Sequence, residues 1–367
     1  MKLSKRIIFA LTSVATIASL MGCGEKKQDD QKNEENNTSI NKEDNSSNEN
    51  QNNNSSPENN NQTPENNNET KNYKREGKKI YFGTYPQNHV TDENKISLLN
   101  SKAGSIPTSS SSGDWNSFKY YNEGNVESYT FYKDVDIDND GSLDYRGIYF
   151  TKYRPNFYTN SSPLEANASQ NDFGYKANTV HWFSFDSIEW NILKDENGKA
   201  FLVSNVVLDN QAYYPTEEKN KFDHNQGNGF ANNYQLSNLR IFLNDTFYAT
   251  AFASEEKEII ESTNVDNTNK SDVENPYVCS NTEDKIFLLS ESETINYLKN
   301  KEDREVKGSD YSKSQGLIGT DSSCYWWLRT PMFNNASRFT LVDIDGNVDK
   351  GGVGSNYGVR PACYISL

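Results

Sequence analysis

The clearest indication of the fold is an aromatic segment near the C-terminus, Tyr325-Trp326-Trp327-Leu328-Arg329-Thr330-Pro331. Aromatic and branched residues that run up to a proline are typical of a β-strand ending at a loop. Because successive residues of a strand face opposite sides of a sheet, the two tryptophans point in opposite directions. One of them is expected in the core. The other is either a stacking platform for a sugar or protein partner, or is also buried, beneath loops.

Outward from this segment, strands and helices follow one another without a regular repeat. Strands are expected at residues 79–86, where Pro86 ends the strand, in a hairpin at 129–153 that turns at Asn139-Asp140-Gly141, and at 181–183, 188–193, 200–208 and 285–289. Helices are expected at 236–252 with Ser237 as N-cap, at 254–260 capped by Ser254, at 290–299 with a Ser290–Glu293 capping box, and at 310–315 capped by Asp310. The sequence therefore predicts an α+β fold of mixed antiparallel strands with a few short helices.

The N-terminus has the organisation of a lipoprotein signal peptide. Three cations among the first six residues precede an apolar run, residues 7–20, which is too short to span a bilayer as a helix. The next residues, Leu20-Met21-Gly22-Cys23, resemble the lipobox of bacterial lipoproteins, in which the cysteine sulfur receives a diacylglyceryl group. We expect residues 1–22 to be a signal peptide, and Cys23 to be lipidated and to hold the protein on the cell membrane, facing outside the cytoplasm. The alternative is an ordinary signal peptide with an incidental cysteine.

A polar segment follows the expected lipid anchor. Residues 24–72 consist almost wholly of Asn, Glu, Gln, Lys, Asp, Ser and Thr, with no aromatic residue. Such a segment cannot bury enough apolar surface to offset the entropy lost on ordering, so residues 23–72 are expected to be the lipidated cysteine and a disordered tether. Beyond it we expect a β-rich part at 73–178 with an Asp-rich hairpin, and an α+β domain at 179–367.

Charge and cysteine content narrow the class of protein. The formal net charge is −15 and there is no basic stripe, which argues against a nucleic-acid partner. Beyond Cys23 the chain has three cysteines, at positions 279, 324 and 363. Three cysteines outside the membrane allow at most one intramolecular disulfide. We expect Cys324 to pair with Cys363, since both flank the closing strands, and Cys279 to be free.

Five sequence blocks carry a resemblance to a known family. They are Ser187–Leu193, Leu239–Phe252, Asp284–Ser290, Tyr325–Pro331 and, near the end, Gly346-Asn347-Val348 with Gly358–Ala362. In this order they resemble a family known only as domain of unknown function 6273, which is common in surface and secreted proteins of Firmicutes, and the resemblance spans about residues 182–367. That family has no established activity. The tryptophan–arginine strand followed by a closing strand also resembles bacterial C-type-lectin-like domains and formylglycine-generating-enzyme relatives, which implies a C-type-lectin-like fold.

The segment at residues 136–144 has the spacing of a calcium-binding loop. Asp136, Asp138, Asp140 and Asp144 occupy positions 1, 3, 5 and 9 of such a loop, with Gly141 at position 6. The bidentate glutamate of position 12 is missing, and the flanks are predicted strands. The sequence therefore leaves two interpretations: a calcium site, which is the one cofactor we expect, or a solvated hairpin tip that needs no ion.

Catalytic groups are poorly represented. His89, His181 and His224 are the only histidines, and none stands in a motif with a cysteine or serine nucleophile. We expect His181 to be a packed strand residue and His224 to lie in a polar loop. Glu189, beside Trp190, is expected to form an ion pair at a strand edge. Arg329 and Arg360 are expected to pair with buried carboxylates.

These observations predict a cell-surface lipoprotein that acts as a non-catalytic module for an extracellular glycan or protein. The alternative is an extracellular enzyme that acts on glycans or the cell wall. Polar and aromatic residues in the C-terminal loops offer the mixture found in recognition surfaces. The expected exposed ligand-binding residues are Phe333, Asn334, Asn335, Arg338, Asp349, Lys350, Asn356 and Tyr357.

Overall fold

The computed structural model describes residues 72–108, 112–121, 127–154, 169–214, 231–268 and 274–367. The expected signal peptide, Cys23, nearly all of the expected tether and His224 lie outside these ranges. The described part combines sheets with short helices, which confirms the α+β class, and most strand pairs are antiparallel. Within it, no helix has the length and apolar character needed to cross a membrane.

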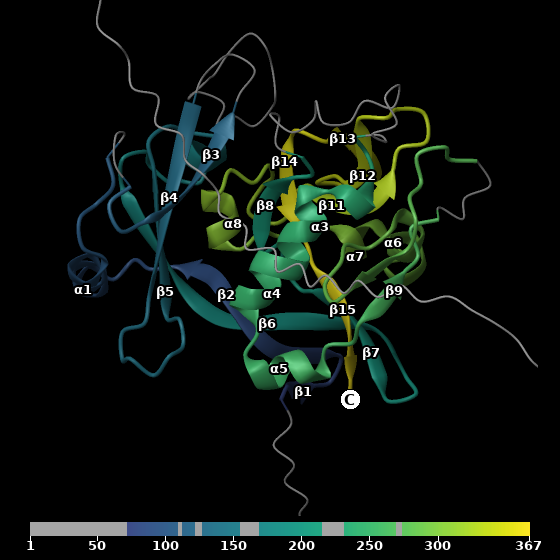
Figure 1. Cartoon of the computed structure of the whole chain (residues 1–367), viewed down its shortest axis with the longest axis horizontal. Helices are drawn as coiled ribbons and strands as arrows, with labels where there is room; N and C mark the ends of the chain where they lie inside the picture. Colours follow the sequence, from purple (N-terminus) through teal and green to yellow (C-terminus); the bar gives the residue numbers. More distant parts are fainter. Residues whose placement is uncertain (1–71, 109–111, 122–126, 155–168, 215–230, 269–273) are drawn as a thin grey trace, which may run out of the picture. The chain divides into compact units, whose positions relative to one another are not determined.

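The larger sheet is organised around one long strand, β6 (Val180–Glu196) (Figure 1). Its eight strands follow the order β1 (Lys74–Glu76), β2 (Lys79–His89), β6, β5 (Tyr145–Phe150), β4 (Glu127–Val135) and β3 (Asn116–Tyr121), while β7 (Lys199–Ser204) joins β6 to β15 (Ala362–Ser366). Residues 181–193, predicted as two strands, thus form one. The prediction that Pro86 ends its strand is also wrong: Pro86 lies opposite Phe185, and a bulge before Asn88 accommodates the missing backbone donor.

A second sheet of five strands contains the aromatic segment. Its order is β13 (Val348–Gly352), β12 (Arg338–Val342), β11 (Trp326–Pro331), β14 (Asn356–Val359) and β8 (Asp209–Ala212), and β9 (Thr263–Val265) pairs separately with β10 (Thr282–Asp284). Trp326 and Trp327 on β11 are both fully buried, so burial on two sides is the correct alternative for this pair. The strand predicted at 285–289 is wrong. That segment is buried but makes only one isolated bridge, from Phe287 to Ala362.

The helices begin largely where capping side chains predict. Ser237 accepts from Arg240 N at the start of α3 (Asn238–Phe242), which continues through the π-helical turn η5 (Leu243–Phe247) into α4 (Tyr248–Ala251). The others are α1 (Glu93–Ala103), α2 (Ser169–Asp172), η4 (Tyr234–Leu236), α5 (Ser254–Ile259), α6 (Glu291–Tyr297), α7 (Lys301–Arg304) and α8 (Asp310–Ser314). The expected caps at Ser254 and Asp310 are wrong by one residue, since Ala253 and Ser309 precede α5 and α8.

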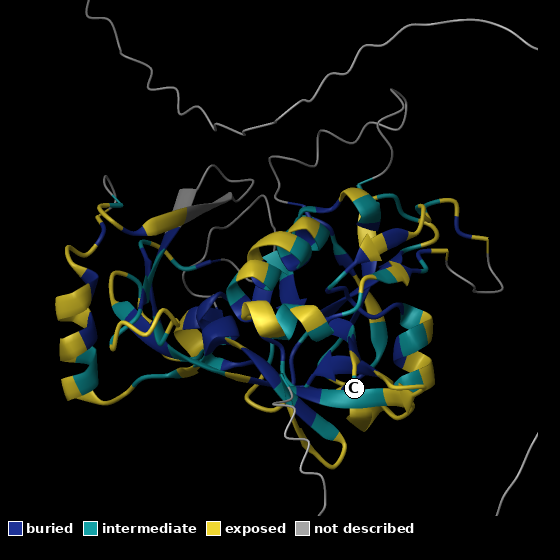
Figure 2. Ribbon diagram, turned by 60° about the horizontal axis from the view of Figure 1, so that its bottom comes forward, coloured by how far each residue is buried: buried dark blue, intermediate teal, exposed yellow. Residues whose placement is uncertain are grey.

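Two clusters of buried apolar residues hold the described part together. The main cluster joins residues of both sheets, such as Trp190 on β6 and Leu328 on β11. The smaller one contains Trp115, Phe131 and Trp182 beside the inner face of α1, whose outer face is exposed (Figure 2). The N-terminal part therefore has a small core of its own. It nevertheless shares the larger sheet with the rest, because β5 pairs directly with β6 across the expected boundary at residue 178.

Candidate functional site

The most organised polar group of the structure centres on Arg329, on strand β11. Its guanidinium is almost fully buried and forms a two-pronged ion pair with Glu293, with Nη1–Oε2 and Nη2–Oε1 distances of 2.5 and 2.8 Å. The same two nitrogens also donate to the backbone carbonyls of Leu288, at 2.6 Å, and Asp266, at 3.2 Å. All four hydrogens of the two Nη atoms are therefore used. The prediction that Arg329 pairs with a carboxylate is confirmed.

Glu293 also caps the helix on which it lies. Ser290 Oγ accepts from the backbone N–H of Glu293, and Glu293 Oε2 accepts from the backbone N–H of Ser290, as the capping-box pattern predicted. The backbone N–H of Glu291 donates to Thr330 Oγ1 at 2.9 Å. One carboxylate thus starts helix α6 and ties it to the buried arginine of β11. These bonds fix the relative position of α6 and β11.

A pocket of about 270 Å³ lies between these elements. It is lined by residues 266–268, by Ser290, Ser292, Glu293, Asn296 and Tyr297 from the cap and helix α6, and by residues 329–331. Its lining is mostly hydroxyl, amide and carboxylate groups, with the ring of Tyr297 and the side chain of Pro331 as apolar surfaces. The volume lies just below the usual range for ligand pockets, about 300–1,000 Å³.

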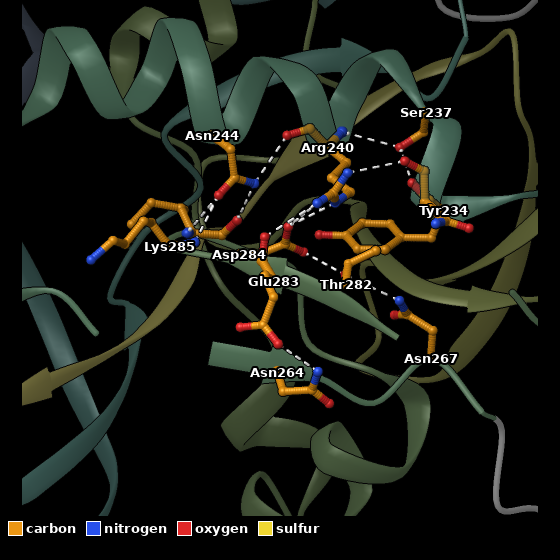
Figure 3. Close-up of polar contacts among 12 residues, drawn as sticks. Tyr234, Ser237, Arg240, Asn244, Asn264, Asn267, Thr282, Glu283, Asp284 and Lys285 are labelled. Atoms are coloured by element: carbon orange, nitrogen blue, oxygen red, sulfur yellow. Dashed lines mark hydrogen bonds and ion pairs between the residues drawn. The ribbon is translucent and has the colours of Figure 1, made fainter. Parts of the chain in front are cut away.

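Asn267, which lines the pocket, belongs to a polar network with Thr282, Asp284 and Arg240 (Figure 3). Asn267 Nδ2 donates to Thr282 Oγ1 at 3.1 Å, and Thr282 Oγ1 donates to Asp284 Oδ2 at 2.8 Å. Arg240 Nε completes the chain with a 2.7 Å bond to the fully buried Asp284. The carbonyl oxygen of the buried Asn267 side chain has no hydrogen-bond partner among the described residues. The network fixes Asn267 through its nitrogen and leaves its acceptor unsatisfied.

The structure places the eight residues predicted to bind a ligand in the loop before β12 and on strands β12, β13 and β14. Phe333, Asn334, Arg338, Asp349 and Lys350 are exposed, and Asn335 and Asn356 are half-buried. The expectation for Tyr357 is wrong: its side chain is buried, with its ring edge-on to that of Trp327 at a centroid distance of 4.8 Å. Asn356 accepts from Arg154 at 2.6 Å. Strand β14, which carries Asn356 and Tyr357, is separated from β12 and β13 by β11.

The Asp-rich loop lies between β4 and β5, at the tip of the predicted hairpin. Asp136, Asp138 and Asp144 bring one carboxylate oxygen each within 4.8 Å of the others, and Asp140 is not part of this group. Several carboxylates also accept backbone N–H groups of the loop, and the bond from Gly141 is the largest cause of the lowered pKa of Asp136. The geometry fits a cation, and it equally fits a tip held by its own hydrogen bonds.

His89, His181 and Glu189 do not form a nucleophilic site with any described residue. His181 is buried and packed as predicted, its Nε2 lies 3.0 Å from the backbone nitrogen of Lys176, and desolvation lowers its pKa to about 4. The ring of His89 packs against that of His181 at a tilted angle of 52°, with a centroid distance of 5.5 Å. Glu189 forms the expected ion pair, with Lys79 on the neighbouring strand.

Two predictions about buried groups are wrong. All three cysteines of the folded part are free, so the predicted Cys324–Cys363 disulfide is absent. Cys324 directs its thiol to the carbonyl oxygen of Val306 at 3.1 Å, and Cys363 is buried on β15. Burial raises the pKa of Cys324 to about 12. Arg360 has no carboxylate partner among the residues that the structure describes. Its Nε donates to the carbonyl of Ser204, its guanidinium lies 4.8 Å from the ring centre of Trp326, and desolvation lowers its pKa to about 10.

The pocket itself was missed by sequence reasoning. The Ser290–Glu293 capping box and Arg329 were each recognised, but they are far apart in the chain. Residues 266–268 carry no motif. The only sequence signals for this pairing were the charge of Glu293, at the third position of a capping box, and an arginine on a strand predicted to be buried.

Comparison with known protein families identifies one domain in the chain. Residues 197–367 match the model of a family described as Domain of unknown function (DUF6273), so a DUF6273 domain is found in the C-terminal half. Comparison of the chain with the curated proteins and with the solved structures gives no match. Every residue that lines the pocket lies inside the DUF6273 domain, whereas the Asp-rich loop lies outside it.

Proposed function

We propose that this chain is a cell-surface lipoprotein, anchored through Cys23 and facing outside the cytoplasm, whose DUF6273 domain binds an extracellular ligand in the pocket between α6 and β11. The observation that carries the proposal is the pocket, whose walls are held in place by the Arg329–Glu293 pair and the capping box. A site that is ordered before its ligand arrives loses less conformational entropy on binding. The lipobox-like sequence ending at Cys23 supports the location.

The charged groups of the pocket favour binding over catalysis. Both oxygens of Glu293 accept from the guanidinium of Arg329. A general acid must carry a proton to the substrate, and both oxygens of this carboxylate are already used as hydrogen-bond acceptors. Asp266 is the other carboxylate of the lining, and its Oδ1 accepts from the backbone and the hydroxyl of Thr268. The lining is therefore suited to hold a polar ligand and poorly suited to cleave one.

A C-type-lectin-like fold remains part of this proposal. Its support is the tryptophan–arginine strand β11 and the closing strands β14 and β15, which carry the sequence pattern of the resemblance.

The proposal is tested by applying the full-length protein, purified in detergent, to an array of glycans and extracellular proteins. We expect at least one ligand, and we expect Asn296→Ala to weaken its binding at least tenfold. Asn296 is exposed on α6 and lines the pocket. Asn94→Ala is the matched control, since Asn94 is an exposed asparagine of helix α1. Unchanged binding by Asn296→Ala, or release of a cleaved product, would contradict the proposal.

A second proposal concerns the Asp-rich loop, which we propose to bind calcium. It is supported by the approach of Asp136, Asp138 and Asp144 to one another, since three carboxylates this close repel and a cation relieves the repulsion. The competing interpretation is the ion-free hairpin tip. The dependence of the melting temperature on calcium separates the two.

A further inference from the structure

The pocket between α6 and β11 has a lining that specifies a class of ligand, and the following inference rests on the binding function proposed above. We infer that the pocket takes a single uncharged sugar ring and discriminates against sugars that carry a carboxylate. Hydrogen-bonding capacity, an aromatic wall, charge and size each contribute to this assignment.

The neutral polar groups of the lining match the needs of hydroxyl groups, which both donate and accept. Thr330 Oγ1 accepts from Glu291 and keeps its own hydrogen for donation. Asn296 and Ser292 are exposed at the helix, and an amide side chain provides donors and an acceptor together. The buried carbonyl of Asn267 still needs a donor. A ligand with neighbouring hydroxyl groups satisfies such a mixture better than one with donors or acceptors alone.

Tyr297 supplies an apolar surface whose position is fixed. Its ring packs edge-on against the buried Phe201, with a centroid distance of 5.4 Å and an angle of 81°. Phe201 in turn stacks on Tyr364 at 4.5 Å. The half-buried Tyr297 lines the pocket and is held in position by this group of packed aromatic rings. A sugar ring has one face rich in C–H groups, and an aromatic ring binds such a face at little cost in conformational entropy.

The charges of the lining oppose an anionic ligand. Among the described lining residues there are two carboxylates, Asp266 and Glu293, and one cationic side chain, Arg329. The Nη hydrogens of Arg329 are all used by Glu293 and by two backbone carbonyls, and its Nε, which has no partner among the described residues, is buried, so the arginine has no exposed donor for an incoming carboxylate. A carboxylate placed here would lose its hydration and gain no cationic partner from the described residues of the lining. This distinguishes a neutral sugar from its uronic acid.

The size of the pocket limits how much of a glycan it can hold. A volume of about 270 Å³ lies below that of most pockets for drug-sized ligands, about 300–1,000 Å³. It accommodates a single ring, so a longer chain would be held by one sugar.

The inference is tested by saturation-transfer NMR titration of the full-length protein with three matched sets of monosaccharides. The neutral set contains the methyl glycosides of glucose, galactose, mannose and N-acetylglucosamine. The acidic set contains glucuronic and galacturonic acid, and the cationic set glucosamine and galactosamine. We expect at least one neutral sugar to bind, its uronic acid to bind at least tenfold more weakly, and Asn296→Ala to weaken the neutral sugar at least tenfold. Asn94→Ala should bind as the parent does, and both variants should keep the parent's melting temperature.

The remaining outcomes separate failure of the inference from failure of the proposed function. Tighter binding of an acidic or cationic sugar, lost in Asn296→Ala, would overturn the ligand class and leave the pocket as the binding site. The same conclusion would follow if no neutral sugar binds but the parent binds a ligand of the array that Asn296→Ala does not bind. A neutral sugar bound equally by Asn296→Ala and the parent would place the site elsewhere and overturn both. Absence of binding to every sugar and to the array would also overturn both.

Discussion

Removal of the Glu293 carboxylate is the most informative perturbation of this fold. Glu293→Ala leaves the guanidinium of Arg329 without a counter-charge, and the Arg329 side chain is only 3% exposed, against 26% for Glu293. Breaking a buried ion pair by removing one partner costs about 3–5 kcal/mol, and the partial exposure of Glu293 favours the lower end. Loss of the reciprocal cap to Ser290 adds about 1 kcal/mol. We therefore expect the free energy of unfolding to fall by roughly 4 kcal/mol.

The coupling between the two side chains is measured by a double-mutant cycle. Arg329→Met removes the charge and keeps an apolar side chain, so the double variant with Glu293→Ala has no unpaired buried charge. We expect the double variant to be less destabilised than the sum of the single variants, with a coupling of about 2 kcal/mol. Asp321→Ala is the control, because its 3.3 Å pair with Lys313 leaves Asp321 92% exposed and should contribute less than about 1 kcal/mol.

Urea unfolding followed by tryptophan fluorescence provides the measurement, since all five tryptophans lie in the folded part. A change in the midpoint at constant slope reports a change in stability. Additive effects, with a coupling below about 0.5 kcal/mol, would refute the argument that this pair holds α6 on β11.

Four further predictions concern other parts of the molecule. Cys23→Ser should abolish incorporation of labelled palmitate, and label remaining on the variant would contradict lipid anchoring. Millimolar calcium should raise the melting temperature of the parent and not that of Asp138→Ala, whereas an unchanged parent would leave only the bare hairpin. The pKa of His181 is about 4 in the folded protein and about 6.5 in the unfolded chain, so the unfolded chain is protonated first as the pH falls. The contribution of His181 to the free energy of unfolding is therefore complete above about pH 6.5 and decreases by about 3 kcal/mol between pH 6.5 and pH 4. His181→Gln should lack that decrease in urea titrations, and an identical pH profile would refute it. Leu341→Ala, in the core, should cost about 2–5 kcal/mol in the same assay, whereas Phe333→Ala, which is 48% exposed, should cost less than about 0.5 kcal/mol, and similar losses would contradict this assignment.

The features predicted correctly are those whose cause lies within a few residues. Asn139-Asp140-Gly141 turns the hairpin because Asn139 and Gly141 adopt positive φ angles that other residues rarely take. Ser237 caps α3 through a bond to a residue three positions later, and Ser290 and Glu293 cap α6 in the same way. Helix starts and tight turns are therefore readable from the chain, because the groups that stabilise them are close in sequence.

The errors concern contacts that depend on where distant segments lie. Pro86 is tolerated within β2 because the register of β2 against β6 shifts directly after it, with Gln87 as the extra residue, and this depends on the pairing with β6. Tyr357 follows a polar loop, yet Trp327 from another strand covers it. Cys324 and Cys363 lie near strands that close the fold, but their buried positions on different segments leave both thiols unpaired.

Arg329 and Arg360 show most directly which features the local sequence predicts and which depend on the tertiary structure. Both arginines occur in aromatic, strand-like segments, and the local sequence predicts burial for each, because hydrophobic neighbours on a strand carry a side chain into the core. Only the tertiary structure decides that Arg329 meets Glu293 and that Arg360 meets a carbonyl group and the ring of Trp326. The pocket arises in the same way, since residues 266–268, α6 and β11 come together only when the sheets pack. Local hydrogen bonds depend on neighbours in the chain, whereas ion pairs and pockets depend on which surfaces the hydrophobic core brings into contact.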